Sequence, residues 1–220
     1  MARTRSYRDR CGIARALDVI GERWALLVVR ELLLGPKRFT DLRRGLAHLS
    51  PDVLAQRLRE LEEAGVVRRR TLAPPAASRV YELTNRGHEL EPAVLALGRW
   101  GSVAPFPADE AGIGPDATAI ALKALFDPTL AGDLEARYGL HLGEDSYGIE
   151  VARGEMNLAR GSAEDPAATI ETDPATLAQV LWHDRRLTET ERSGDLTISG
   201  SRQAAKRLLA LFPLPESASD

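Results

Sequence analysis

Apolar side chains recur every three or four positions along the first part of the chain. In the segment CGIARALDVIG, Ile13, Leu17 and Ile20 share one stripe of a predicted helix. The next segment, RWALLVVRELLLG, is apolar almost all round, which indicates a buried second helix. A Gly-Pro pair follows and should end this helix, because proline cannot continue it.

Capping residues mark two further helices. In FTDLRRGLAHLS, Thr40 is the expected N-cap of a third, short helix. Ser50 is the expected N-cap of a fourth helix, and Pro51 falls at its first position, where the missing N–H costs nothing. The fourth helix should run to about Ala64 and stop at Gly65.

Two β-prone runs come next, VVRRRTL and SRVYELT, joined by APPAA. This arrangement predicts a β-hairpin. Thr84 should then cap a fifth helix over NRGHELEPAVLALGRWG. Four helices, a hairpin and a helix, in this order, are typical of a winged helix-turn-helix.

The second half has a different pattern. The stretch GSVAPFPADEAGIGPDA is rich in Gly, Pro and acidic residues and reads as a linker. Beyond it, RYGLHL, SYGIEVAR, EMNLARG, ATIETD and GDLTISG indicate five antiparallel strands. TAIALKALFD, DPATLAQVLW and SRQAAKRLLALF indicate helices, and the class is α+β. We therefore predict a winged helix-turn-helix domain over 1–102, a linker over 103–115 and an α+β domain over 116–215.

The two halves differ in charge. Residues 1–104 carry 19 basic and 12 acidic side chains, a formal charge of +7, whereas residues 105–220 carry 10 and 20, a charge of −10. This asymmetry indicates two domains that bind different partners, and the partner of the basic domain could be a polyanion.

Other function classes find little support in the sequence. No run of about 18 apolar residues suggests a membrane span, and no apolar segment of a secretory signal follows the basic N-terminus. A single cysteine, Cys11, allows no intrachain disulfide, so we expect a cytoplasmic protein. P-loop, GxGxxG and GxSxG motifs are absent, and the histidines lack ligand spacing, so we expect no cofactor, no metal and no enzyme. The four histidines are His48, His88, His141 and His183.

The fourth predicted helix has two faces. Leu54, Leu58 and Leu61 form a stripe that should pack on the preceding helices. Gln56 and Arg59 lie on the opposite face, and such side chains bond bidentately to adenine and guanine edges. Acidic residues in the last turns would be repelled by phosphates, so the front half, residues 50–59, is the part that would enter a DNA groove. The alternative is a solvated polar face on a core helix.

The resemblance to a known family rests on GERWALLVVREL, RFTDLRR, LSPDVLAQRLRELEEAGVV and VYELTNRGHEL. Over residues 11–100 the chain resembles the HxlR-type winged helix regulators, relatives of the MarR class. The resemblance implies a homodimer on a palindromic operator of double-stranded DNA, and repression or, less often, activation. It also implies that the first helix and the helix after the wing form the dimer. Asp52 departs from the family pattern and leaves the operator sequence open.

The predicted DNA contacts combine the third helix, the front of the fourth helix and the arginines of the hairpin, which can act as a wing over phosphates or in the minor groove. They are Arg38, Thr40, Ser50, Pro51, Asp52, Ala55, Gln56, Arg57, Arg59, Arg68, Arg69, Arg70 and Arg79.

Two further resemblances concern regulation. Many HxlR-type proteins have a cysteine where this chain has Cys11, and some sense thiol-reactive electrophiles with it. Here Cys-Gly replaces the usual Cys-Pro, and a small packed side chain is the alternative. The second half resembles the sterol carrier protein two-like fold, in which a hydrophobic tunnel lies between helices and sheet. This implies a small apolar ligand, unless the same residues only fill the core. The candidate lining is Leu125, Phe126, Leu177, Leu181, Trp182, Leu208 and Phe212.

The sequence thus favours a DNA-binding transcriptional repressor that a small apolar ligand in the second domain controls. The alternative from another class is a lipid or small-molecule binding protein whose winged helix mediates protein contacts.

Overall fold

The computed structural model describes residues 6–73, 77–103 and 112–215. The chain divides into two compact units, Met1–Val94 and Leu95–Asp220. Most of the expected linker, residues 104–111, lies outside the described residues, and the predicted domain bounds stay a prediction.

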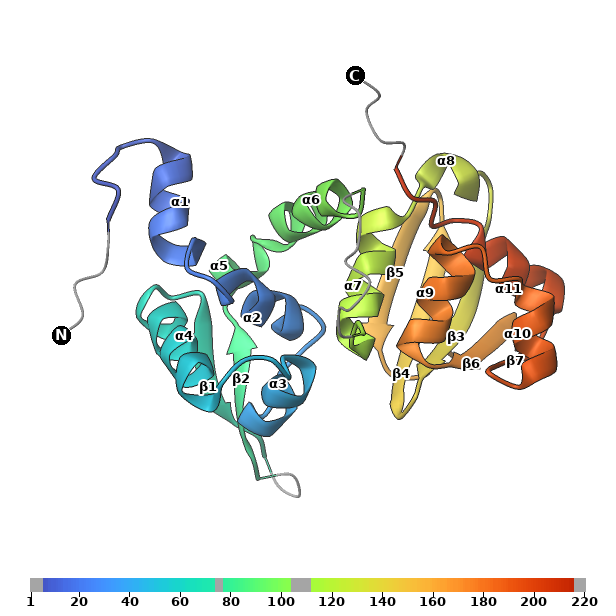
Figure 1. Cartoon of the computed structure of the whole chain (residues 1–220), viewed down its shortest axis with the longest axis horizontal. Coiled ribbons are helices and arrows are strands. Elements are labelled where there is room, and N and C mark those ends of the chain that lie inside the picture. Colours follow the sequence, from blue (N-terminus) through green and yellow to red (C-terminus); the bar gives the residue numbers. More distant parts are fainter. Residues whose placement is uncertain (1–5, 74–76, 104–111, 216–220) are drawn as a thin grey trace. The chain divides into compact units, whose positions relative to one another are not determined.

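The first unit has the predicted order of helices and hairpin (Figure 1). Helix α6 crosses the boundary between the units. The elements are α1 (Gly12–Ile20), α2 (Ala25–Leu32), α3 (Phe39–Gly45), α4 (Pro51–Glu63), β1 (Val67–Thr71), β2 (Arg79–Leu83), α5 (Asn85–His88) and α6 (Glu91–Gly101).

The core of this unit lies between α2, α4 and the hairpin. Val28 of α2 and Leu54 and Leu58 of α4 are fully buried, each with no exposed surface. Burying a leucine side chain contributes roughly 1.5–3 kcal/mol, so this seam holds α4 firmly to the body of the unit. The polar face of α4 is thereby turned away from the core.

Helix α1 behaves differently. Its apolar stripe is open to solvent, with Ile13 72% and Leu17 41% exposed, and Ala14 is its one buried residue. The stripe predicted from the sequence exists, and the described chain covers Ile20 in part but leaves Ile13 and Leu17 open.

Two helix boundaries differ from the prediction. Thr40 is not the N-cap of α3; Arg38 holds that position, and the Asp41 carboxylate accepts a hydrogen bond from the Arg38 backbone N–H at 3.2 Å. The fifth predicted helix is two helices, α5 and α6. Thr84 caps α5 as predicted, accepting from the Gly87 N–H at 3.1 Å. Pro92 has no N–H to donate to the preceding turn, which explains the break before α6.

A buried ion pair ties the hairpin to the helices. The Lys37 backbone N–H and C=O pair with Tyr81 of β2 at 2.9 and 2.8 Å. The Lys37 Nζ lies 2.5 Å from a carboxylate oxygen of Glu31 in α2, and both residues are buried. Breaking such a pair leaves an uncompensated charge, so Lys37 fixes the hairpin against α2.

The second unit contains one five-stranded sheet with helices over one face (Figure 1). Its elements are α7 (Pro115–Leu125), α8 (Pro128–Ala131), β3 (Ala136–Leu142), β4 (Asp145–Ala152), β5 (Glu155–Arg160), β6 (Ala168–Thr172), α9 (Pro174–Trp182), α10 (Leu187–Ser193), β7 (Leu196–Gly200) and α11 (Arg202–Leu209). Five strands and the three longer helices are those predicted, whereas α8 and α10 are not.

The sheet is mixed, so the prediction of an entirely antiparallel sheet is wrong. The strand order is β5-β4-β3-β6-β7, and β3 pairs with β6 in parallel. The chain leaves the edge strand β5 and must cross β4 and β3 before β6 begins. Its backbone at Ala163 lies 3.4 Å from where a Cβ on Gly148 would stand. The crossing chain therefore passes close to the middle of β4, at a distance that a Cβ on Gly148 would meet as an ordinary van der Waals contact.

None of the helices that the structure describes has the length and apolar character needed to cross a bilayer. Within the same residues, no three His, Cys, Asp or Glu side chains come together as metal ligands would.

Candidate nucleic-acid interface

Helix α4 is built with a defined start and a defined end. The Ser50 hydroxyl accepts from the Val53 N–H at 3.4 Å, and Pro51 follows at the first helical position. At the other end, Gly65 has φ +69°, a conformation that a residue with a side chain seldom adopts. The caps fix which turns of α4 stand at the front, where N–H groups and the helix dipole attract phosphate.

The predicted DNA contacts fall into two groups by exposure. Three are half-buried: Ala55, Gln56 and Arg57. Ten are exposed: Arg38, Thr40, Ser50, Pro51, Asp52, Arg59, Arg68, Arg69, Arg70 and Arg79. Arg59 is exposed and Gln56 is half-buried, so both keep surface that a DNA contact could use.

A chain of hydrogen bonds runs along the polar face of α4. The Arg59 guanidinium donates to the side-chain oxygen of Gln56 at 2.6 Å. The Gln56 side-chain nitrogen in turn donates to Oε1 of Glu60, also at 2.6 Å. The amide of Gln56 is therefore held at both ends.

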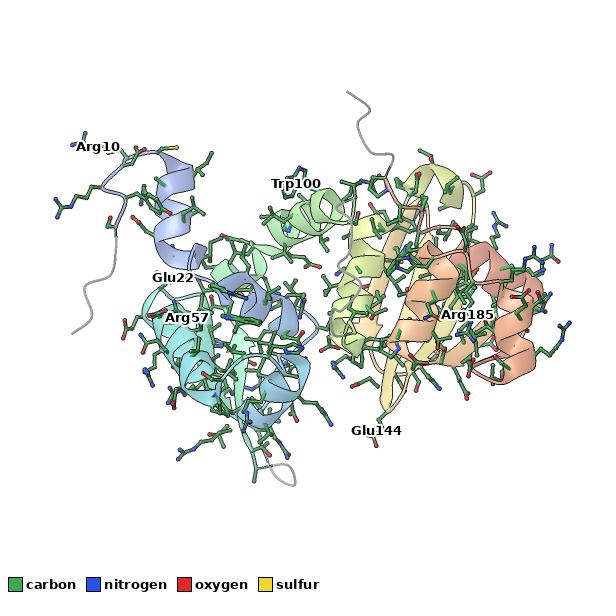
Figure 2. All side chains as sticks on the ribbon, in the orientation of Figure 1. Arg10, Glu22, Arg57, Trp100, Glu144 and Arg185 are labelled. Atoms are coloured by element: carbon green, nitrogen blue, oxygen red, sulfur yellow. The ribbon has the colours of Figure 1, made fainter. Side chains whose placement is uncertain are left out.

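Arg57 does not stand on this open face. Its side chain is 15% exposed, and its Nη1 lies 2.5 Å from Oε2 of Glu60 and 3.6 Å from Oε2 of Glu22. Figure 2 shows Arg57 of α4 beneath Glu22, which precedes α2. The structure thus uses Arg57 to join α4 to the corner between α1 and α2.

The arginines of the hairpin are paired but remain open to solvent. Arg68 and Arg70 both contact Glu82, at 2.8 and 3.1 Å, and Arg69 lies 2.9 Å from Glu62. Each of the three side chains keeps more than half of its surface exposed. The Arg69–Glu62 pair lies at the surface and is weak, so the Arg69 guanidinium can exchange this carboxylate for a phosphate. Arg68 and Arg70 neutralise the buried Glu82 carboxylate and offer a phosphate only the exposed sides of their guanidinium groups.

Three features of this surface were missed from the sequence. Arg43 of α3 and His48 in the turn before α4 are exposed basic side chains. The first helix of a helix-turn-helix crosses the DNA backbone, and this rule could have suggested them. The hub position of Glu60 had no comparable signal, because it depends on side-chain conformations.

The predicted ligand lining lies at the helix-covered side of the sheet. Leu125, Leu177, Leu208 and Phe212 are buried. The rings of Phe126 and Phe212 are 6.4 Å apart, and Trp182 Nε1 donates to the Phe212 carbonyl at 3.0 Å. Such contacts suit a filled core, and a ligand site here stays a prediction.

A buried polar cluster joins α7 to the sheet in the second unit. Asp116 accepts from the Tyr147 hydroxyl and from Arg160, both at 2.5 Å, and Arg160 also donates to Asp145 at 2.7 Å. Burial, and then the hydrogen bond to the Asp116 carboxylate, raise the pKa of Tyr147. Tyr147 therefore stays a neutral donor, which suits a structural link between α7, β4 and β5.

The remaining candidate, Cys11, is exposed and directly precedes α1. Sensing would require this exposure, and the role of Cys11 stays a prediction.

The helices, the paired hairpin and the open front of α4 define a winged helix-turn-helix unit. The profile of the HxlR-like helix-turn-helix family matches residues 19–105. The chain is 36% identical over 88 residues to the HTH-type transcriptional regulator YvaP of Bacillus subtilis, a match that covers 40% of this chain and 82% of YvaP. The chain therefore belongs to the HxlR-like helix-turn-helix family.

Other relatives match over a similar share of the chain, between 40% and 46%. The HTH-type transcriptional regulator Mb3122 of Mycobacterium bovis is 39% identical over 89 residues, which are 40% of this chain and 56% of Mb3122. Among solved structures, the reduced form of the transcriptional regulator YodB from B. subtilis is 30% identical, with a TM-score of 0.39. That match covers 46% of this chain and all of YodB.

Proposed function

We propose that this protein is a sequence-specific DNA-binding transcriptional regulator that acts as a repressor. The observation that carries the proposal is the open front of α4, where Gln56 and Arg59 are available beside exposed hairpin arginines. Membership of a family whose relatives are named transcriptional regulators supports it.

The front turns of α4, residues 50–59, enter the major groove. Gln56 and Arg59 face base edges there, and the N–H groups at the start of the helix face a phosphate. The hairpin lies over the adjacent backbone or minor groove, where Arg68, Arg69 and Arg70 neutralise phosphates.

The protein works as a homodimer on a palindromic operator. Large apolar side chains are exposed on α1, where Ile13 is 72% exposed, and on α6, where Leu97 is 50% and Trp100 78% exposed. Exposed apolar side chains of this size mark a candidate interaction surface on each of the two helices taken by itself. A twofold dimer places its two recognition helices about one DNA turn, roughly 34 Å, apart.

The second unit senses a small apolar ligand or stabilises the dimer. A ligand that moves the two recognition helices by a few ångströms weakens binding, because the spacing of the half-sites is fixed. Mass spectrometry of natively purified protein tests this part of the proposal: a co-purified apolar molecule supports it, and protein that carries none and binds none contradicts it.

The DNA proposal is tested by fluorescence anisotropy with the duplex upstream of the protein's own gene and with duplexes selected from a random pool. Affinity should fall steeply with salt. Arg59→Ala should relax base preference, whereas Arg69→Ala should weaken binding to all sequences alike. If wild-type protein selects no sequence and both variants bind as it does, the protein is not this kind of regulator, and a ligand carrier whose winged helix contacts proteins takes its place.

A further inference from the structure

We infer that Glu60 is a positioning residue that sets the base preference of α4 by holding the amide of Gln56. The inference rests on the proposed function. It starts from two hydrogen bonds of 2.6 Å, one from the Gln56 nitrogen to Glu60 and one from Arg59 to the Gln56 oxygen. Both bonds lie on the face that is open to DNA.

The direction of the amide matters because its two ends differ chemically. The oxygen only accepts and the nitrogen only donates, so a glutamine that reads adenine must offer both in one order. A freely rotating amide offers both orders. In this structure the nitrogen faces Glu60 and the oxygen faces Arg59, which leaves one N–H and one lone pair of Gln56 for a base in a fixed sense.

Glu60 is itself held in place. Its second oxygen lies 2.5 Å from Nη1 of Arg57, and Arg57 also lies 3.6 Å from Glu22, in the corner between α1 and α2. This ion pair favours the conformer of Glu60 in which its other oxygen accepts from Gln56. The Arg57 side chain is 15% exposed, holds the Glu60 carboxylate and is not available to a phosphate.

The negative charge of Glu60 has a second consequence. A carboxylate near the DNA backbone opposes binding to every sequence. Removing Glu60 should thus strengthen binding to unrelated DNA while it weakens discrimination between sequences. An acidic residue that affects only charge would produce the first change without the second.

Glu63 provides the matched control. It lies one turn further along α4, is exposed, and makes no hydrogen bond or ion pair among the described residues. Glu63→Ala removes the same charge and leaves the contacts of Gln56 intact.

The experiment uses the full chain and a duplex selected by the wild-type protein from a random pool. Anisotropy then gives the affinity for that duplex and for each single-base variant. For wild-type protein we expect discrimination of roughly five- to a hundredfold at the base pair that Gln56 reads. Glu60→Ala should reduce it to about twofold or less, while Glu63→Ala should preserve it.

Two further variants make the result specific. Glu60→Gln keeps one oxygen that can accept from Gln56 but turns an NH2 group toward Arg57, so it should retain part of the discrimination that Glu60→Ala loses. In a Gln56→Ala background, Glu60→Ala should change nothing more at that base pair. Circular dichroism melts show whether each variant is folded.

Unchanged discrimination in folded Glu60→Ala would overturn the inference and leave the proposed function standing, because the wild-type protein would still select a sequence. Failure of the wild-type protein to select any sequence would overturn the proposed function itself. The two failures are therefore distinguishable in one set of measurements.

Discussion

Helices α1 and α4 carry the same kind of apolar stripe, but the stripe is buried in α4 and largely exposed in α1. In α4, Leu58 is completely buried against the helices that precede it. In α1, Ile13 and Leu17 are 72% and 41% exposed. Both stripes follow the helical period. The period therefore identifies an apolar face, but it does not show whether the same chain or another molecule buries that face.

The starts of the two helices differ as well. The Ser50 hydroxyl of α4 accepts a backbone N–H, whereas Cys11 at the start of α1 makes no side-chain cap. Helix α4 is thus stabilised from within its own unit at both its side and its end. Helix α1 lacks a side-chain cap and buries only Ala14 fully within its own unit.

The largest expected effect on stability comes from truncating a side chain of the buried stripe of α4. Leu58→Ala should lower the free energy of unfolding by about 2–5 kcal/mol, because it removes buried methyl groups and leaves a cavity. Urea unfolding followed by circular dichroism measures this loss. A loss below about 1 kcal/mol would mean that α4 is not packed as described.

Truncating a side chain of the exposed stripe of α1 should weaken self-association. Leu17→Ser removes an exposed apolar side chain from the proposed dimer face of α1 and should weaken self-association by about 1–3 kcal/mol. Sedimentation velocity over a concentration series gives the dissociation constant. Leu130→Ser is the matched control, since Leu130 of α8 is 51% exposed and lies on neither proposed dimer helix. Equal sedimentation of both variants and wild-type protein would remove α1 from the interface.

The same contrast explains what the sequence could predict. Local chemistry was sufficient for α4, where Ser50-Pro51 marks the start and Gly65 the end. It was not sufficient at α3, where Thr40 is the better capping residue by type but Arg38 holds the position and Asp41 completes the turn. Residue preferences describe populations, and the adjoining strand bridge at Lys37 decides where this chain turns.

Long-range arrangements could not be predicted from the sequence, for a different reason. The parallel pairing of β3 with β6 depends on the path of the chain across the sheet, which the alternation within each strand does not encode. The polar chain through Glu60 likewise depends on side-chain conformations. Residue types on the face of α4 indicated candidate base contacts, whereas the residue that holds one of them became apparent only in three dimensions.

A smaller effect should separate the two helix starts. Ser50→Ala removes the acceptor for the Val53 N–H and should cost about 1 kcal/mol of stability. Cys11→Ala should change stability by less than about 0.5 kcal/mol, because no side-chain cap is lost. Thermal melts of both variants, compared with wild-type protein at one concentration, measure the difference. An equal loss in both would show that the Ser50 hydroxyl is not what stabilises α4.

The smallest effect involves a cap that titrates, which Ser50 does not. Asp173 begins α9 and accepts from the backbone N–H groups of Ala175 and Thr176 at 2.9 and 3.0 Å. Burial raises the pKa of Asp173, but the hydrogen bonds from Thr176 and Ala175 outweigh it, so the pKa lies below its usual range. The charged cap therefore stabilises the protein above the unfolded pKa of about 3.9, and this contribution is lost as the pH falls through the lower folded value. Because water screens this exposed group, we expect its contribution to the free energy of unfolding to be roughly 0.5 kcal/mol. Urea unfolding at pH 6 and at pH 3 measures the loss of this contribution. Asp173→Asn caps without titrating, so it should show a smaller pH difference than wild-type protein, and an identical difference would mean that the Asp173 carboxylate contributes nothing to the acid sensitivity of the fold.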